Sequence, residues 1–145
     1  MPVPLRDVLI AGHGRWRGEH WGALYTAYGR SPFFDYIAPE LHHIIVDGNQ
    51  RYLIDFNNAL QDLICEFADL DLTWSMLSAS GNVASADYRG NTASKHGDTL
   101  PVTDVPYHQV WQERAGGFCA GLSVLDLVFN TGREAVLTLM AMTSE

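Results

Sequence analysis

His20 and the two arginines that precede it, Arg15 and Arg17, have the residue types and the spacing to do chemistry on an anionic ligand. Histidine exchanges a proton near neutral pH, and the planar fork of arginine pairs with phosphate or carboxylate. All three residues fall at the start of a helix expected over residues 17–28, where the helix dipole also favours an anion. The pattern predicts a catalytic role for His20 and a ligand-binding role for Arg15 and Arg17. A hydrogen-bonded histidine in a half-buried seam and salt-bridged surface arginines are the alternatives.

The same segment carries Gly12, Gly14 and Gly18 between an expected strand and this helix. A glycine-rich loop in such a place binds the pyrophosphate of dinucleotides in other folds. Here the spacing is GxGxxxG, arginine and tryptophan occupy the intervening positions, and no series of alternating strands and helices follows. We therefore do not interpret the segment as a dinucleotide-binding loop, and the sequence predicts no cofactor.

Asn57 and the polar segment 77–104 supply the other candidate ligand-binding residues. Asn57 keeps the register of the apolar positions of an expected helix and should face inward, where an amide needs a backbone or ligand partner. The polar segment is rich in Ser, Ala, Gly, Asn and Asp, and packing does not require its Asp87, Arg89 and Lys95. It is either a solvated loop or a lid whose cations close over an anionic sugar nucleotide or acyl donor.

Three polar residues near the C-terminus are interpreted as structural. Asp126 and Glu134 complete S/T-x-x-acid sequences that begin at Ser123 and Thr131, a pattern typical of helix caps. Asn130 lies where two expected helices meet, which favours a cap or a turn.

The histidines and cysteines do not predict a metal site. His42 and His43 are adjacent, so they point in different directions on a helix, and His13 has no suitable partner spacing. Cys65 and Cys119 stand alone, without a CxxC pair.

Apolar spacing predicts a helix-rich α+β fold in a single domain over 1–145, with four to six helices and a small sheet. The expected helical segments are 17–28, a short element after Ser31-Pro32, a turn over 39–47 ended by Gly48, 50–70, and two C-terminal helices after Ser123 and Thr131. The expected strands are 6–11 and 71–75.

Composition limits the classes of function. The chain has 145 residues, 17 acidic against 9 basic, and a net charge of −8. That charge argues against nucleic acid or an anionic membrane as the main partner. No apolar stretch approaches the roughly 20 residues that span a bilayer, and no signal-peptide pattern is visible. These features predict a soluble, cytoplasmic protein.

The sequence resembles the WbqC-like protein family through motifs that follow one another along the chain. These are Trp16-Arg-Gly-Glu-His20-Trp21, Tyr28-Gly-Arg-Ser-Pro-Phe-Phe-Asp35, Asp55-Phe-Asn57-Asn58, Asp87-Tyr-Arg89, Tyr107-His-Gln109-Val-Trp111 and Leu122-Ser-Val-Leu-Asp-Leu-Val-Phe-Asn-Thr-Gly132. Members usually begin with a Gln/Leu-Pro-x-Tyr-x-Pro-like segment and an Asn-Arg segment. The resemblance therefore implies the later part of the family domain, lacking its N-terminal segment.

The family takes its name from an O-antigen biosynthesis locus, so the resemblance implies a role in bacterial surface-polysaccharide assembly. The leading interpretation is a transferase that acts on an activated sugar, with a sugar nucleotide as its anionic ligand. The alternative is a non-catalytic accessory or scaffold protein of the same machinery. It rests on a predicted exposed aromatic patch, which would bind a protein partner or the missing N-terminal half. The patch consists of Phe33, Phe34, Tyr36 and Trp111.

Overall fold

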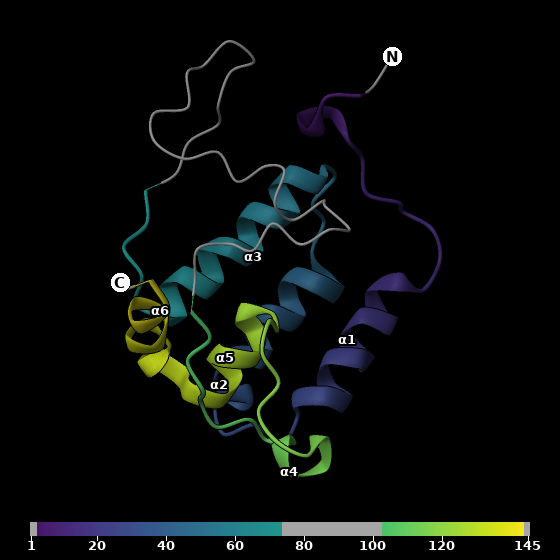
Figure 1. The fold of residues 1–145 in the computed structure, drawn as a ribbon. Helices are drawn as coiled ribbons and strands as arrows, with labels where there is room; N and C mark the ends of the chain where they lie inside the picture. The colour runs from purple at the N-terminus through teal and green to yellow at the C-terminus, as the bar shows by residue number, and fades with distance from the viewer. Residues whose placement is uncertain (1–2, 74–102, 144–145) are drawn as a thin grey trace.

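Helices form the whole regular architecture of the computed structural model, which describes residues 3–73 and 103–143 (Figure 1). The elements are η1 (Leu5–Asp7), α1 (Trp16–Tyr28), α2 (Phe34–His42), η2 (His43–Asp47), α3 (Leu53–Phe67), α4 (Gln112–Ala115), α5 (Val124–Thr131), η3 (Gly132–Glu134) and α6 (Ala135–Thr143). η2 is a single π-helical turn that continues α2. The helices expected over 17–28 and 50–70 are confirmed as α1 and α3, and the turn over 39–47 is confirmed as the end of α2 with η2.

The prediction of a small sheet is wrong for the described residues. In the expected strand 6–11, pairing is limited to one isolated antiparallel bridge between Leu9 and Tyr52. The Ile10 N–H donates to the carbonyl of Arg51 at 3.0 Å, and α3 begins two residues after Arg51. A strand needs an extended partner, and here the partner ends where α3 starts.

The prediction of a second strand over 71–75 is also wrong for those of its residues that the structure describes. Residues 71–73 are exposed and form no strand, while residues 74 and 75 lie outside the described residues. The α+β class is therefore replaced by a helical one in the described ranges.

The core lies where α2, η2, α5 and the start of α6 meet, with the end of α3 against them. Figure 1 shows α2 and α5 at the centre, with α1 on one side and α6 on the other. On α2 and η2, residues at helical spacing point inward together. The buried apolar residues are Phe34, Ile37, Leu41, Ile45, Ala68, Leu127, Val128, Phe129 and Ala135. Because α5 is central, polar residues on it are buried as well.

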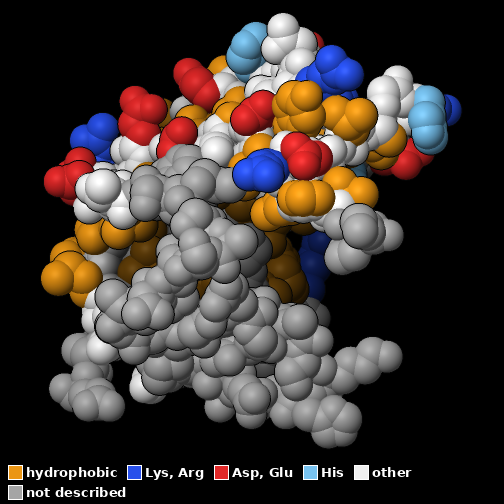
Figure 2. All heavy atoms as spheres, turned by 90° about the horizontal axis from the view of Figure 1, so that it is seen from above, with side chains coloured by type: hydrophobic (Ala, Val, Ile, Leu, Met, Phe, Trp, Pro, Cys, Tyr) orange, Lys and Arg blue, Asp and Glu red, His pale blue; other side chains and the backbone are white. Residues whose placement is uncertain are grey.

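The surface is mixed in character. On the face that Figure 2 shows, acidic side chains are spread among hydrophobic and basic ones. None of the described helices is long and apolar enough to cross a membrane.

Candidate functional site

A hollow with an aromatic wall lies at the start of α1. Its volume is about 630 Å³, and its lining residues are Leu9, Ile10, Ala11, His13, Trp16, His20, Leu53 and Phe56. The Trp16 indole N–H donates to the carbonyl of Ala11 at 3.0 Å, which fixes the segment before the helix. The rings of Trp16 and Phe56 meet edge to face, with centroids 6.0 Å apart. The hollow therefore has an apolar aromatic wall, which can contact the ring of a ligand.

His20 lines this hollow from the second turn of α1 and is exposed. Its Nδ1 lies 2.9 Å from the Trp16 carbonyl oxygen. Because a carbonyl only accepts hydrogen bonds, we assign the ring proton to Nδ1. In the tautomer with this proton on Nδ1, the lone pair is on Nε2.

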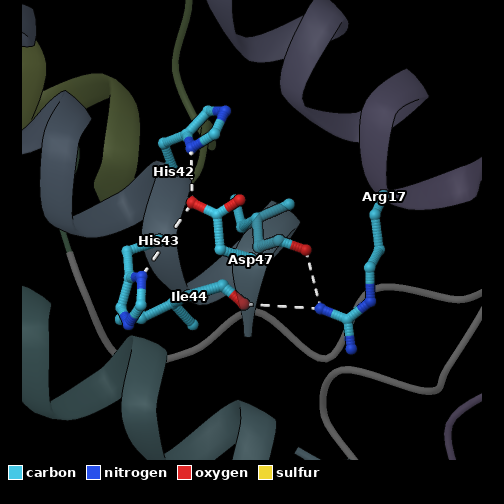
Figure 3. Close-up of polar contacts among 6 residues, drawn as sticks. Arg17, His42, His43, Ile44 and Asp47 are labelled. Carbon is cyan, nitrogen blue, oxygen red and sulfur yellow. Dashed lines mark hydrogen bonds and ion pairs between the residues drawn. The ribbon is translucent and has the colours of Figure 1, made fainter. Parts of the chain in front are cut away.

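Arg17 is held by the backbone of η2 (Figure 3). Its Nη1 donates to the carbonyl of Ile45 at 2.7 Å and to that of Ile44 at 3.4 Å. The guanidinium carbon also lies 4.8 Å from the centre of the Trp16 ring. Carbonyls at the end of a helical turn lack intrahelical donors, and Arg17 supplies one. The side chain therefore fastens α1 and the aromatic wall to η2.

Arg15 differs from Arg17 although only one residue separates them. It is exposed and is the residue that precedes α1. Among the described residues its guanidinium has no hydrogen-bond or ion-pair partner. Of the two arginines, Arg15 is the one whose whole guanidinium is available to a ligand.

We expect Arg17→Ala to lower the free energy of unfolding by about 1–3 kcal/mol, because two carbonyls lose a charged donor. Arg17→Lys should recover only part of the loss, since an ammonium lacks the flat group that covers Trp16. Urea unfolding measures both variants. The matched control is Arg15→Ala, which should stay within about 0.5 kcal/mol. An equal loss in the control would contradict the fastening role of Arg17.

The adjacent histidines of α2 and η2 share one carboxylate (Figure 3). The Nδ1 atoms of His42 and His43 lie 3.1 Å and 3.9 Å from Oδ2 of Asp47. Within the described ranges, no group of three or more His, Cys, Asp or Glu is placed to hold a metal ion.

Asn57 is exposed on α3, so the expectation that it faces inward is wrong. At about 100° per residue, Asn57 falls at the edge of the apolar face that Phe56, Leu60 and Leu63 form. α3 has no fully buried residue within its bounds. The other candidates, Asp87, Arg89 and Lys95, lie outside the described residues.

A buried polar network that the sequence analysis missed is centred on Asp126 of α5. Asp126 and Gln109 are both 0% exposed. Oδ2 of Asp126 accepts the Tyr107 hydroxyl at 2.7 Å and the Gln109 side-chain N–H at 3.0 Å. The Gln109 amide also pairs in both directions with the backbone of Cys119. The capping role expected for Asp126 is therefore wrong, because its carboxylate joins the segment 107–119 to the core.

Asn130 extends this network by one helical turn. Its Oδ1 accepts the Val110 N–H at 2.9 Å, and its Nδ2 donates to the Asp126 carbonyl at 2.7 Å. The side chain is buried. Asn130 is thus a cross-link between α5 and the segment before α4, rather than the cap or turn expected.

Only one of the two expected capping sequences forms a cap. The Ser123 Oγ accepts the Leu125 N–H at 3.3 Å, so the cap of α5 is confirmed. Thr131 instead donates to the carbonyl of Leu127 at 2.7 Å and caps nothing. Glu134 ends the short η3 and is exposed, so its expected capping role has no counterpart.

Asp126 also determines the protonation of two tyrosines. Burial, and next the charge of Asp126 and a hydrogen bond to it, raise the pKa of Tyr28 from 10.0 to about 12. Burial and then the hydrogen bond to Asp126 raise the pKa of Tyr107 as well. Both phenols are therefore neutral donors near neutral pH.

The aromatic patch expected for a scaffold protein does not form as predicted. Phe34 is 1% exposed in the core, while Tyr36 is 73% exposed. Phe33 and Trp111 are half-buried. Phe34 is therefore not part of an exposed patch, and the accessory or scaffold interpretation stays a prediction.

This chain belongs to the WbqC-like protein family, whose sequence model matches residues 3–89. The matched range includes the hollow at the start of α1, whereas the Asp126 network extends beyond it. The "Uncharacterized protein Rv1507c" of Mycobacterium tuberculosis is similar, at 26% identity over 155 residues. That similarity covers 90% of this chain and 67% of the mycobacterial protein. No solved structure matches significantly.

Proposed function

We propose that the protein binds a sugar nucleotide in the hollow at the start of α1 and acts as a transferase on that activated sugar. The observation that carries this proposal is the position of His20. Its Nε2 lone pair is free at the edge of an aromatic hollow, and the unpartnered Arg15 is the residue that precedes the same helix. The family name favours bacterial surface-polysaccharide biosynthesis as the setting.

Each part of the site has a role in this proposal. The nucleotide base rests against Trp16 and Phe56, and the diphosphate meets Arg15 and the free N–H groups of the first turn of α1. The nucleophilic group of the acceptor gives its proton to Nε2 of His20 as it attacks the activated carbon, and the nucleoside diphosphate leaves. Arg17 holds the Trp16 wall in place.

Four residues remain proposed as further ligand contacts. Asn57 is exposed on α3 directly after Phe56, which lines the hollow. Asp87, Arg89 and Lys95 are proposed from their sequence alone.

Calorimetric titration with a panel of nucleotide sugars, starting with UDP-glucose, tests the binding step. Arg15→Ala should weaken binding roughly tenfold, because one charge-assisted hydrogen bond to phosphate is lost. His20→Ala should lower transfer to an acceptor by about 10²–10⁴-fold. His108→Ala, which removes an exposed histidine outside the hollow, is the control and should change neither quantity. A cooperatively folded chain that binds no nucleotide sugar would contradict the proposal.

A further inference from the structure

A second hollow lies between the C-terminal end of α1 and α4. Its volume is about 650 Å³, and its lining residues are Thr26, Ala27, Arg30, Val110, Trp111, Glu113 and Arg114. α1 has 13 residues, which at 1.5 Å per residue makes it about 20 Å long. Figure 1 shows α4 beside the end of α1 that is farther from its first residue. This hollow is therefore separate from the one that contains His20.

Two arginines face this hollow without acidic partners. Arg30 and Arg114 are both exposed. Within the described ranges neither forms an ion pair, although Glu113 lines the same hollow. The chain carries a net charge of −8, so acidic side chains are in excess over basic ones. Two guanidinium groups that line one hollow without acidic partners can both pair with an anion bound in it.

The buried network fixes the walls of this hollow in place. Trp111 directly follows Val110, whose N–H is bound by Asn130. On the opposite wall, Arg30 comes two residues after Tyr28, whose ring packs against the Phe129 ring of α5 with centroids 5.0 Å apart. Both walls are thus tied to the central helix α5. A site whose walls are already fixed loses less entropy when a ligand binds.

Trp111 adds an aromatic side chain to the lining of this hollow. Its indole Nε1 is buried and has no hydrogen-bond acceptor in the part of the chain that is described, so a ligand in the hollow does not reach it. Trp111 therefore offers a ligand an apolar contact.

We propose that this hollow binds the phosphate group of a small phosphorylated molecule. The phosphate lies between Arg30 and Arg114, and the organic part of the molecule lies against the Trp111 ring. A phosphate fits better than a single carboxylate, because three terminal oxygens serve two planar guanidinium forks at once. The inference goes beyond the proposed transferase function and uses none of its residues.

The test is a proton–nitrogen NMR titration of the full chain at constant ionic strength, with phenyl phosphate and inorganic phosphate as probes. The signals to follow are the Trp111 indole and the side-chain N–H groups of Arg30 and Arg114. Both probes should give saturating shifts of these signals, and phenyl phosphate should bind more tightly because its ring contacts Trp111. Arg30→Ala and Arg114→Ala should each weaken binding roughly tenfold or more. Arg133→Ala, which removes an exposed arginine that does not line the hollow, should leave binding unchanged.

Three results would overturn the inference. One is the absence of saturating shifts at Trp111, and another is an equal loss of affinity in Arg133→Ala, which would indicate general attraction by charge. The third is loss of phenyl phosphate binding in Arg15→Ala but not in Arg30→Ala, which would place the phosphate at the other end of α1. That third result would leave the proposed function standing, so the two proposals fail separately. Equal affinity for the two probes would overturn the contact with Trp111.

Discussion

Asp126→Ala is expected to lower the free energy of unfolding by about 3–5 kcal/mol, one of the largest losses from a single substitution in this chain. The substitution removes the acceptor of two donors at once, the Tyr107 hydroxyl at 2.7 Å and the Gln109 N–H at 3.0 Å. Each donor left without an acceptor in the interior costs about 1–3 kcal/mol. The truncation also leaves a cavity beside a side chain that is 0% exposed. Urea unfolding, with its midpoint and slope, measures the loss.

Two variants separate the hydrogen bonds from the effects of truncation. Asp126→Asn keeps the shape and one acceptor oxygen, so it should lose less than Asp126→Ala. Tyr107→Phe removes a single donor and should lose about 1–2 kcal/mol. Asp104→Ala is the matched control, because Asp104 is exposed, and it should stay within about 0.5 kcal/mol. If Asp126→Ala lost no more than this control, Asp126 would not hold the network together.

The helices could be predicted from the sequence because their signals are local. α1 and α3 each repeat apolar residues at helical spacing over several turns, so a window of the sequence contains the whole pattern. The sequence predicts the two ends of α3 less accurately than it predicts the helix itself. The pattern covers 50–70, whereas the helix runs from Leu53 to Phe67. Propensity and period do not determine where the first and last turns fray.

The strands could not be predicted because a strand depends on a distant partner. The run Val8-Leu-Ile-Ala11 has the β-branched and apolar residues of a strand. Within the described ranges its pairing is one bridge with Tyr52 and the hydrogen bonds beside it, and the chain turns into α3 immediately afterwards. A short apolar run in the sequence does not indicate whether a second extended segment will lie beside it.

The residues of the candidate site also differ in whether their contacts are local in the sequence. His20 and Arg15 belong to one local segment, and the structure places Arg15 directly before α1 and His20 in its second turn, as the helix expected over 17–28 implies. Arg17 could not be assigned in the same way, because the carbonyl oxygens it binds belong to residues 27 and 28 positions later. The arginine residue type indicates an anion-binding site. The contacts of Arg17 with Ile44 and Ile45 instead make it a structural link between α1 and η2.

The local sequence around Asp126 fits two roles for its carboxylate, a helix cap and a buried hydrogen-bond acceptor. Ser123-Val-Leu-Asp126 is a good capping sequence, and Ser123 does cap α5. The missed signal was the position of Asp126 inside the apolar run Leu125 to Phe129, where a charged side chain is buried only if it has partners. Those partners come from residues 107–109, and no local rule connects the two segments.

Gly132→Ala is expected to lower the free energy of unfolding by about 2–6 kcal/mol, through two separate effects. Gly132 has a φ of +61° and a ψ of −134°, a combination that glycine alone adopts readily, and strained backbone of this kind costs a residue with a side chain about 1–3 kcal/mol. An added Cβ would also lie 2.6 Å from Cδ1 of the Phe33 ring, and overpacking of this kind costs about 1–3 kcal/mol. The ring has little freedom to retreat, because the Phe33 N–H donates to the carbonyl of Phe129 at 3.0 Å and holds the start of α2 against α5.

Gly22→Ala is the matched control, since Gly22 lies inside α1 and an added Cβ would meet nothing within 4 Å. It should raise the free energy of unfolding by about 0.5–1 kcal/mol, because alanine loses less backbone entropy in a helix. The double variant Phe33→Ala with Gly132→Ala divides the two effects. In the Phe33→Ala background, adding Gly132→Ala should cost only the backbone part, about 1–3 kcal/mol. A Gly132→Ala protein as stable as Gly22→Ala would show that α2 and α5 do not meet closely at Gly132, and an unchanged cost without the Phe33 ring would place the whole effect in the backbone.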